Sequence, residues 1–187
     1  LSAQVASRSA AVFRHGVASG DPDATSVVLW TRVTASRPQD VVWELADNPG
    51  FKPMLRQGRC ATGPERDYTV KVLAEELEPG RAYFYRFRAA GAVSPVGQTR
   101  TLPVGRVERL GIALASCSNY AFGFFNAYEA IAGDPAIDFV LHTGDYIYEY
   151  GAAGWGSDVA RRLGRVHEPA GETVSLADYR ARHAQYK

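Results

Sequence analysis

The chain has 187 residues, of which 46% are hydrophobic, 22% charged and 11% aromatic, which is typical of a globular protein and excludes a disordered or fibrous one. The formal net charge is +1, from 21 basic and 20 acidic side chains, so no long-range field favours nucleic acid or a membrane surface as a partner. No apolar stretch is long enough to form a transmembrane segment.

Residues 1–10 (LSAQVASRSA) are mostly small or polar, and the first residue is leucine. Such a segment is compatible with the start of a mature exported protein, although no export signal is visible. The two cysteines, Cys60 and Cys117, do not form a disulfide framework. We interpret Cys60 as a small buried hydrophobic residue and expect it not to be bonded to Cys117.

The first half of the sequence, from residue 11 to about residue 100, alternates between strand-like runs and turns. The runs SVVLWTRV (residues 26–33) and VVWELA (residues 41–46) are rich in β-branched and aromatic residues, which favour strands. About seven short strands, separated by turns at roughly 8–12-residue spacing, predict an antiparallel β-sandwich of the fibronectin III or immunoglobulin type. We assign this all-β domain to residues 1–105.

One turn in this half has a specific signature. The run RAYFYRFRA places Tyr83, Tyr85 and Phe87 on one face of a strand. The turn before it, residues 77–80 (LEPG), resembles the entry into a late strand of fibronectin type III domains, where a tyrosine hydroxyl ties the corner to the backbone. We therefore predict two adjacent antiparallel strands over residues 67–89, with Tyr83 buried at the corner.

The second half has a different pattern. Residues 109–117 (RLGIALASC) and 137–145 (IDFVLHTGD) are apolar runs of the kind found in strands buried on both faces, and residues 124–134 fit a helix. Strand, helix and strand in this order predict a parallel βαβ unit. Two strands and one helix are too few for a stable α/β domain, so we expect residues 106–187 to begin a larger one.

The last segments are a glycine-rich stretch and a helix. Residues 151–174 are weakly periodic and are predicted to be a long loop. Ser175 and Asp178 have the spacing of a capping box, which predicts a helix that starts there and runs toward Lys187.

Three side chains with ligand chemistry follow the two apolar strands. Cys117 ends the first strand, and Asp145 ends the second with Tyr148 three residues later. Ligands of open α/β sheets bind at the carboxyl ends of strands, so neighbouring strands would bring these groups together. Each group can lose its proton beside a cation and then bind it. A thiolate with a phenolate favours iron over magnesium.

Each of these residues also has a simpler interpretation. Asp145 can cap the following turn, Cys117 can be an inert core thiol, and Tyr148 can be an aromatic residue at a sheet edge. Asn119 is a weak candidate for substrate binding. Among the histidines, we interpret His142 as a hydrogen-bonded structural group inside its strand. We interpret the other two downstream histidines as solvated surface residues, namely His167 and His183.

Five segments, which follow one another along nearly the whole chain, resemble the alkaline phosphatase D family: residues 13–33, 94–101, 115–128, 138–151 and 176–187. The resemblance implies an exported phosphomonoesterase or phosphodiesterase with an N-terminal sandwich and a calcineurin-like metallophosphatase domain. It implies ferric iron and calcium as cofactors. It also implies that Cys117 and Tyr148 are metal ligands and that Asp145 bridges the two metals.

The resemblance further implies hydrolysis of phosphate esters by a metal-activated water. A phospholipase D-like phosphodiesterase of the same family and a non-catalytic binding module built on the sandwich are the alternatives. The expected substrate is a small phosphate ester, a phosphodiester polymer or a lipid headgroup, and the expected location is periplasmic, cell-wall associated or secreted. The family's other ligands lie in segments that would follow Lys187, so we expect the 187 residues alone to be inactive without the rest of the catalytic domain.

Overall fold

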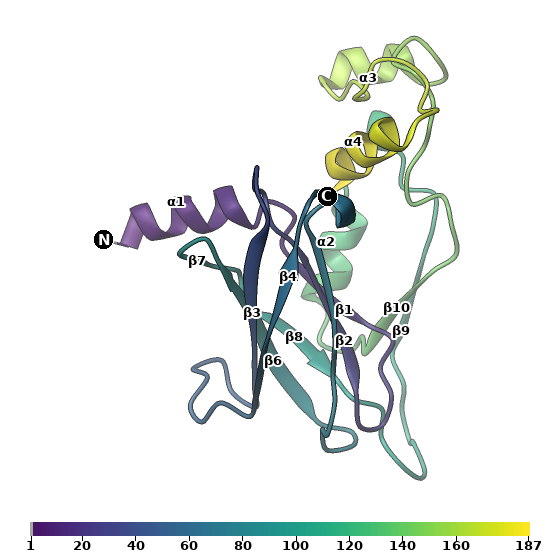
Figure 1. Cartoon of the computed structure of the whole chain (residues 1–187). Coiled ribbons are helices and arrows are strands. Elements are labelled where there is room, and N and C mark those ends of the chain that lie inside the picture. Colours follow the sequence, from purple (N-terminus) through teal and green to yellow (C-terminus); the bar gives the residue numbers. More distant parts are fainter. Residues whose placement is uncertain (1) are drawn as a thin grey trace. The chain divides into compact units, whose positions relative to one another are not determined.

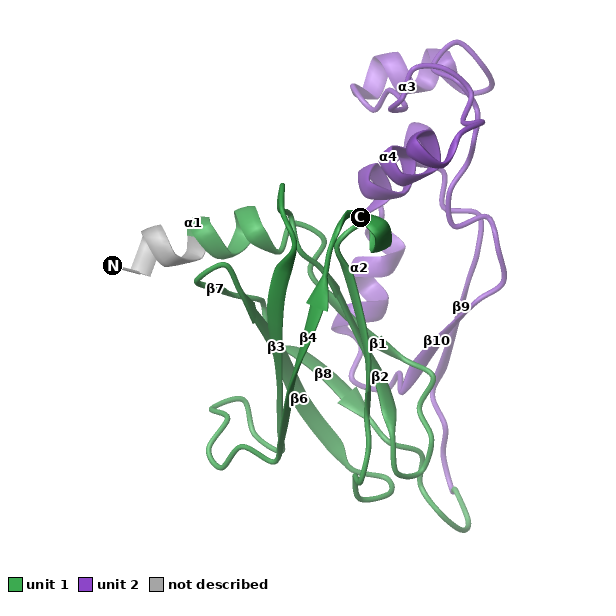
Figure 2. Ribbon diagram, viewed as in Figure 1, with its two compact units in different colours: residues 1–107 green, residues 108–187 purple. Residues whose placement is uncertain are grey.

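The computed structural model describes the main chain of residues 2–187 and the side chains from residue 7 onward (Figure 1). The chain divides into two compact units, Leu1–Val107 and Glu108–Lys187 (Figure 2). No helix in the described part of the chain is long and apolar enough to cross a membrane.

The first unit consists of a helix, a short 3-10 turn and eight strands. They are α1 (Ser2–Val12), β1 (Val17–Gly20), β2 (Val27–Arg32), β3 (Gln39–Ala46), β4 (Arg56–Thr62), η1 (Pro64–Arg66), β5 (Thr69–Ala74), β6 (Ala82–Ala89), β7 (Ala92–Val93) and β8 (Gly97–Arg100). The strands form two antiparallel sheets. One has the order β1-β2-β5, and the other has the order β4-β3-β6-β7 with β8 also paired to β6.

The core of this unit lies between the two sheets. Buried residues alternate with more exposed ones along β2 and β6, as expected for strands with one face in a core. The core cluster combines Leu29 from the smaller sheet with Leu45 and Phe87 from the larger one, and each is 0% exposed. Apolar side chains from both sheets share one core, so the first unit is an antiparallel β-sandwich, as the sequence predicts.

The pairing predicted for residues 67–89 is wrong, whereas the predicted corner is correct. β5 pairs with β2 and β6 pairs with β3, so these consecutive strands belong to different sheets. Tyr83 is 2% exposed, and its hydroxyl accepts a hydrogen bond from the Glu78 backbone N–H at 2.8 Å. The chain crosses from one sheet to the other at this turn, and the hydroxyl satisfies a backbone donor that the crossing leaves outside both ladders.

We expect Tyr83→Phe to lower the free energy of unfolding by about 1–3 kcal/mol, because the Glu78 N–H would lose its partner at a partly buried corner. Urea denaturation measures this change. Tyr68→Phe, at a half-exposed tyrosine of the same unit, is the control and should change stability by less than about 0.5 kcal/mol. Equal effects of the two substitutions would show that the corner bond does not contribute.

The second unit contains the predicted βαβ motif. Its elements are β9 (Ile112–Ala115), η2 (Tyr120–Phe122), α2 (Asn126–Gly133), β10 (Phe139–His142), α3 (Ser157–Leu163) and α4 (Leu176–Tyr186). β9 and β10 are parallel, with Ala115 opposite His142, and α2 is the crossover between them. The parallel pairing confirms the prediction and places both strand ends at the same edge of the sheet.

The prediction that these two strands are buried on both faces is wrong for the described chain. Ile112 is 51% exposed, Leu114 69% and Val140 48%. A parallel sheet is normally covered on both faces. The sheet of the second unit has only the strands β9 and β10 among the described residues, so it lacks the neighbouring elements that would cover its apolar side chains.

The glycine-rich stretch is not a continuous loop, because it contains the short helix α3. Gly156 precedes this helix with a φ of +83° and Gly164 follows it with a φ of +66°, so the glycines mark its two ends. The predicted capping box of α4 is confirmed. The Ser175 side chain accepts from the Asp178 backbone N–H, and the Asp178 carboxylate accepts from the Ser175 backbone N–H.

Candidate functional site

The loops that follow β9 and β10 are joined by main-chain hydrogen bonds. The Thr143 N–H donates to the Ala115 carbonyl at 2.9 Å, which continues the parallel ladder past the strands. The Cys117 N–H donates to the Gly144 carbonyl, and the Ser118 N–H donates to the Asp145 carbonyl, both at 3.2 Å. These bonds hold the two loops in a fixed register and set Cys117 beside Asp145.

The structure brings together the three residues that the sequence singled out at these strand ends. One carboxylate oxygen of Asp145, Oδ2, accepts from Cys117 Sγ at 3.4 Å and from the Tyr148 hydroxyl at 3.2 Å. A thiol and a phenol therefore donate their protons to the same atom. Metal ions bind thiolates, phenolates and carboxylates after such protons leave, so this convergence suits a cation.

The backbone at this point is held in an uncommon conformation. Cys117 has a φ of +57° and Asp145 a φ of +54°, both in the left-handed region, and Gly144 has a φ of +121°. A left-handed residue other than glycine costs about 1–3 kcal/mol, and such residues cluster at functional sites. Aspartate adopts this region more readily than most residues, so Cys117 is the more informative of the two.

The surroundings of Tyr148 oppose ionisation of its phenol. Partial burial, the hydrogen bonding with Cys117 and the hydrogen bond to Asp145 all raise the pKa of Tyr148 above its usual value. A neighbouring carboxylate disfavours a second negative charge, whereas a bound cation reverses this effect. The raised pKa therefore keeps Tyr148 as a neutral phenol that donates to Asp145.

No group of three or more His, Cys, Asp or Glu residues that could hold a metal ion is present in the described part of the chain. Cys117 and Asp145 are two such residues, and Tyr148 is the third member of the cluster. Even a four-coordinate ion needs one more ligand than these three side chains supply. These three side chains by themselves therefore leave at least one coordination position of such an ion unfilled.

A buried arginine fixes the segment that carries Tyr148. Arg182 of α4 is 0% exposed and donates from Nη1 to the main-chain carbonyls of Tyr148 and Tyr150, the latter at 3.0 Å. Its Nε donates to the Glu168 carbonyl and its Nη2 to the Pro169 carbonyl, both at 2.9 Å. A planar guanidinium can join several carbonyls in this way because its donors point in fixed directions.

The histidines differ in how they match the sequence interpretation. His142 is hydrogen-bonded as expected, with its Nε2 2.9 Å from the Tyr128 hydroxyl. His183 is exposed, and its ring centroid lies 5.6 Å from that of Tyr146. His167 is 2% exposed, so its assignment to the solvated surface is wrong.

His167 is buried because α4 covers it. Its Nδ1 lies 3.0 Å from the Tyr150 carbonyl, so Nδ1 carries the proton and Nε2 accepts from the Tyr186 hydroxyl at 3.3 Å. Burial and the nearby charge of Arg182 lower the pKa of His167, which favours this neutral form. His167 thus links the Tyr150 segment to α4.

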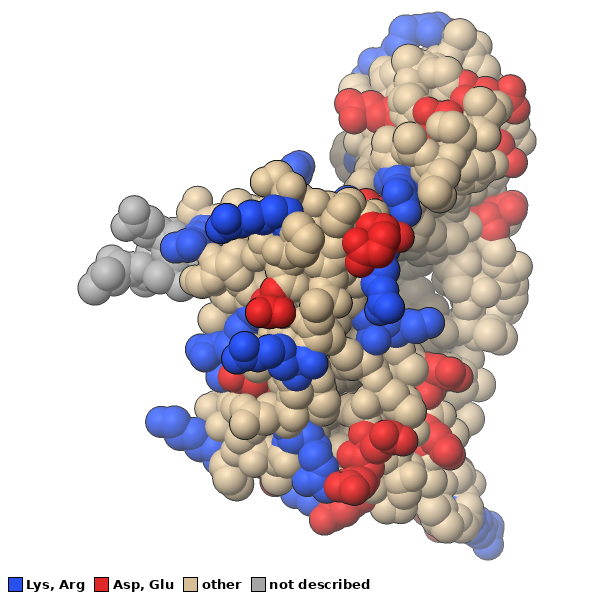
Figure 3. Space-filling model, viewed as in Figure 1, with Lys and Arg blue, Asp and Glu red and all other residues tan. Residues whose placement is uncertain are grey.

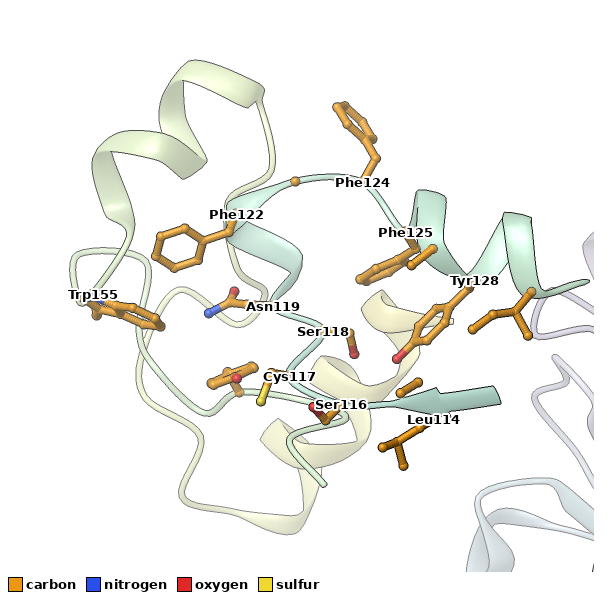
Figure 4. Close-up of a pocket in the computed structure, with 15 residues that line it drawn as sticks. Leu114, Ser116, Cys117, Ser118, Asn119, Phe122, Phe124, Phe125, Tyr128 and Trp155 are labelled. Carbon is orange, nitrogen blue, oxygen red and sulfur yellow. The ribbon is translucent and has the colours of Figure 1, made fainter. Parts of the chain in front are cut away.

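A cavity of about 650 Å³ lies next to the cluster (Figure 4). Cys117 and Tyr148 line it, together with Asn119 and the rings of Phe122 and Trp155. The Asn119 Oδ1 accepts from the Ala121 N–H at 2.9 Å and caps η2. Its Nδ2 is buried without a hydrogen-bond partner among the described residues, so its N–H groups are available to a ligand.

The sequence interpretation did not identify Trp155 or Arg182 as residues of this region. Trp155 could have been found as an isolated aromatic residue in the glycine-rich stretch. Arg182 had no sequence signal, because an arginine in a helix is usually solvated and its carbonyl partners come from distant segments.

Both units of the chain are similar to proteins of known families. Residues 1–103 match the family described as PhoD-like phosphatase, N-terminal domain, and residues 112–187 match the family described as PhoD-like phosphatase. Alkaline phosphatase D of Bacillus subtilis (strain 168) is 41% identical over 186 residues, which cover 94% of this chain and 31% of that protein. The chain therefore spans about a third of the length of this relative.

Solved structures of other proteins are also similar to this chain. A structure of PhoD matches with a TM-score of 0.84 and 39% sequence identity, covering 94% of this chain and 35% of that chain. The sixth fibronectin type III domain of human fibronectin type III domain containing protein 3 matches with a TM-score of 0.34 and 19% identity, covering 50% of this chain and 87% of that domain. The second score is too low to support an argument.

Proposed function

The chain belongs to the PhoD-like phosphatase family, and on that premise we propose that it forms part of a metal-dependent phosphoesterase. The observation that carries the proposal is the convergence of Cys117 Sγ and the Tyr148 hydroxyl on one oxygen of Asp145. In this proposal the second unit begins a calcineurin-like catalytic domain, and the sandwich precedes it.

The donor set fits ferric iron with calcium. A thiolate and a phenolate suit iron, and the carboxylate of Asp145 has a second oxygen for a hard cation such as calcium. When bound, these cations supply a Lewis acid and lower the pKa of a water molecule. Asp145 would bridge the two ions, while Cys117 and Tyr148 would complete the iron side.

The chain's own residues prepare this site before any cation binds. The hydrogen-bonded loops hold Cys117 beside Asp145, and Arg182 holds the main chain of Tyr148. The donors therefore need little rearrangement when a cation takes the place of their protons. Such prior organisation lowers the cost of binding and keeps the geometry suited to the reaction.

The distribution of charge supports a localised phosphate group as the target. The formal net charge is +1, and basic and acidic side chains are interspersed on the face drawn in Figure 3. A long polyanion is usually held by a stripe of Lys and Arg. We propose that bound cations, and not a basic groove, supply the positive charge for the substrate.

We expect the full-length, iron-loaded protein to absorb visible light, because a phenolate bound to ferric iron produces such a band. Tyr148→Phe should remove the band and lower activity at least about tenfold, since it removes one metal ligand. Absorption spectra and activity assays measure both effects. Tyr146→Phe, which changes a neighbouring phenol, is the control and should keep the band. A Tyr148→Phe protein that remained coloured would show that Tyr148 is not the ligand.

A further inference from the structure

Four aromatic rings form a continuous row that starts at the candidate metal centre. Tyr148 and Tyr150 are stacked, with ring centroids 5.9 Å apart and planes at 23°. Trp155 meets Tyr150 edge-on at 5.8 Å, and Phe122 packs against Trp155 at 4.5 Å. We call Tyr148, Tyr150, Trp155 and Phe122 the aromatic wall.

The outer part of the aromatic wall is open to solvent. Trp155 is 61% exposed, and Tyr150 and Phe122 are each 40% exposed. Large rings gain stability when they are buried, and here it is the adjoining cavity, rather than exposure alone, that indicates a ligand as the group that covers them. Phe122, Trp155 and Tyr148 also line the cavity, so this surface and the cavity belong together.

The wall is fixed in place by its backbone. A Cβ atom added at Gly156 would lie 2.5 Å from the ring of Phe122, so the ring packs directly on the main chain beside Trp155. Gly156 also has a φ of +83°, which a side chain would strain. Because the ring of Phe122 packs closely on Gly156, the aromatic wall is preorganised. A preorganised surface binds a flat group at a low entropic cost.

The polar groups of the cavity indicate which part of a substrate lies there. No Lys or Arg is among the residues that line it, so the cavity is unsuited to a second anionic group. In Figure 4 the amide nitrogen of Asn119 points toward the side on which Phe122 and Trp155 lie. This nitrogen is buried without a partner among the described residues and can donate to an oxygen of a ligand.

We propose that the aromatic wall binds the leaving alcohol of the substrate and selects alcohols that carry an uncharged ring. The proposal rests on the proposed phosphatase function and deepens it. With the phosphorus near Asp145, hydrolysis breaks its bond to the alcohol oxygen, and the alcohol leaves with a proton supplied by water. The oxygen of that water forms the new bond to phosphorus, so phosphate is the second product. The ring of the alcohol lies against Trp155, and an oxygen of the substrate accepts from Asn119 Nδ2. Aromatic rings and the apolar faces of pyranose sugars share this chemistry.

The test compares phosphate esters of an aromatic alcohol, a sugar and an alkyl alcohol that has no ring. Benzyl phosphate, glucose 6-phosphate and propyl phosphate are assayed with full-length, metal-loaded protein, each also as its methyl diester. Trp155→Ala should lower kcat/KM for a ring-bearing ester about tenfold and for the propyl ester less than about twofold, whereas Trp155→Phe should restore most of the loss. Tyr179→Ala, at a 42% exposed tyrosine on α4, is the control and should change none of them.

The outcomes distinguish ring binding by the aromatic wall from the hydrolysis reaction itself. Loss on the benzyl ester alone identifies an aryl group, and loss on the glucose ester alone identifies a sugar. Equal loss on all three esters would overturn the proposal while leaving the phosphatase function intact.

Calorimetry with benzylphosphonate and propylphosphonate, which lack the scissile bond, provides a readout that does not need turnover. In one outcome, the protein hydrolyses no ester and still binds benzylphosphonate about tenfold more tightly than propylphosphonate, with Trp155→Ala removing the difference. That result would support ring binding by the aromatic wall and show that the proposed function is wrong. Equal binding of the two phosphonates by the wild-type protein would show that the aromatic wall does not bind the ring.

Discussion

Replacing Asp145 with asparagine is expected to lower kcat/KM for phosphate-ester hydrolysis by at least about a thousandfold in the full-length protein, which corresponds to about 4 kcal/mol of transition-state stabilisation. Asp145 Oδ2 is the atom on which Cys117 and Tyr148 converge. An amide of the same shape keeps the packing but has no charge and a single acceptor oxygen, so it cannot bridge two cations.

Metal content distinguishes loss of the site from loss of folding. Asp145→Asn should retain the far-UV circular dichroism spectrum of the wild type while losing bound iron and calcium, measured by elemental analysis. Asp158→Asn, at a side chain that is 93% exposed on α3, is the matched control and should change activity less than about twofold. An Asp145→Asn protein with more than a tenth of wild-type activity would rule out the bridging role.

Replacing Arg182 with methionine is expected to destabilise the protein by about 3–5 kcal/mol, measured as the free energy of unfolding in urea. Methionine fills a similar length but donates no hydrogen bond, so the carbonyls of Tyr148, Tyr150, Glu168 and Pro169 would lose the donor that Arg182 provides. Arg182→Lys should lie between methionine and the wild type, because an ammonium group keeps the charge without the planar fork.

A role in positioning Tyr148 predicts more than lost stability. In Arg182→Lys that is still folded, the visible band expected for iron-bound Tyr148 should shift or weaken, and hydrogen exchange should accelerate in the segments around Tyr148 and Glu168. Arg162→Met, which changes an exposed arginine of α3, is the control and should alter stability by less than about 0.5 kcal/mol. An unchanged band in Arg182→Lys would leave Arg182 with a structural role alone.

The sequence predicts local structure well wherever short-range physics decides it. Alternation along residues 81–89 reflects the period of a strand, and the capping box at Ser175 reflects hydrogen bonds within one turn. The turn before Tyr83 predicts a corner because the hydroxyl reaches a backbone group five residues away. The parallel order of β9 and β10 follows from the helix between them.

Predictions that depend on distant partners are the ones that are wrong. The strands β5 and β6 are neighbours in sequence, but hydrogen bonding to β2 and β3 assigns them to different sheets. Alternation specifies which face of a strand is apolar and does not specify its partner. His167 looks like a surface residue in a glycine-rich stretch and is buried because Tyr186, 19 residues later, covers it.

For the candidate site, the sequence by itself determined which groups stand at the two strand ends, since the end of a buried run and the spacing of Cys117, Asp145 and Tyr148 are local features. Only the tertiary structure decided that two of these side chains donate to one oxygen of the third. It also decided that Arg182 holds the Tyr148 segment and that Trp155 packs edge-on against Tyr150. The physical reason is that these contacts join segments far apart in the chain, and their geometry is set by packing and hydrogen bonding in three dimensions, which sequence spacing does not encode.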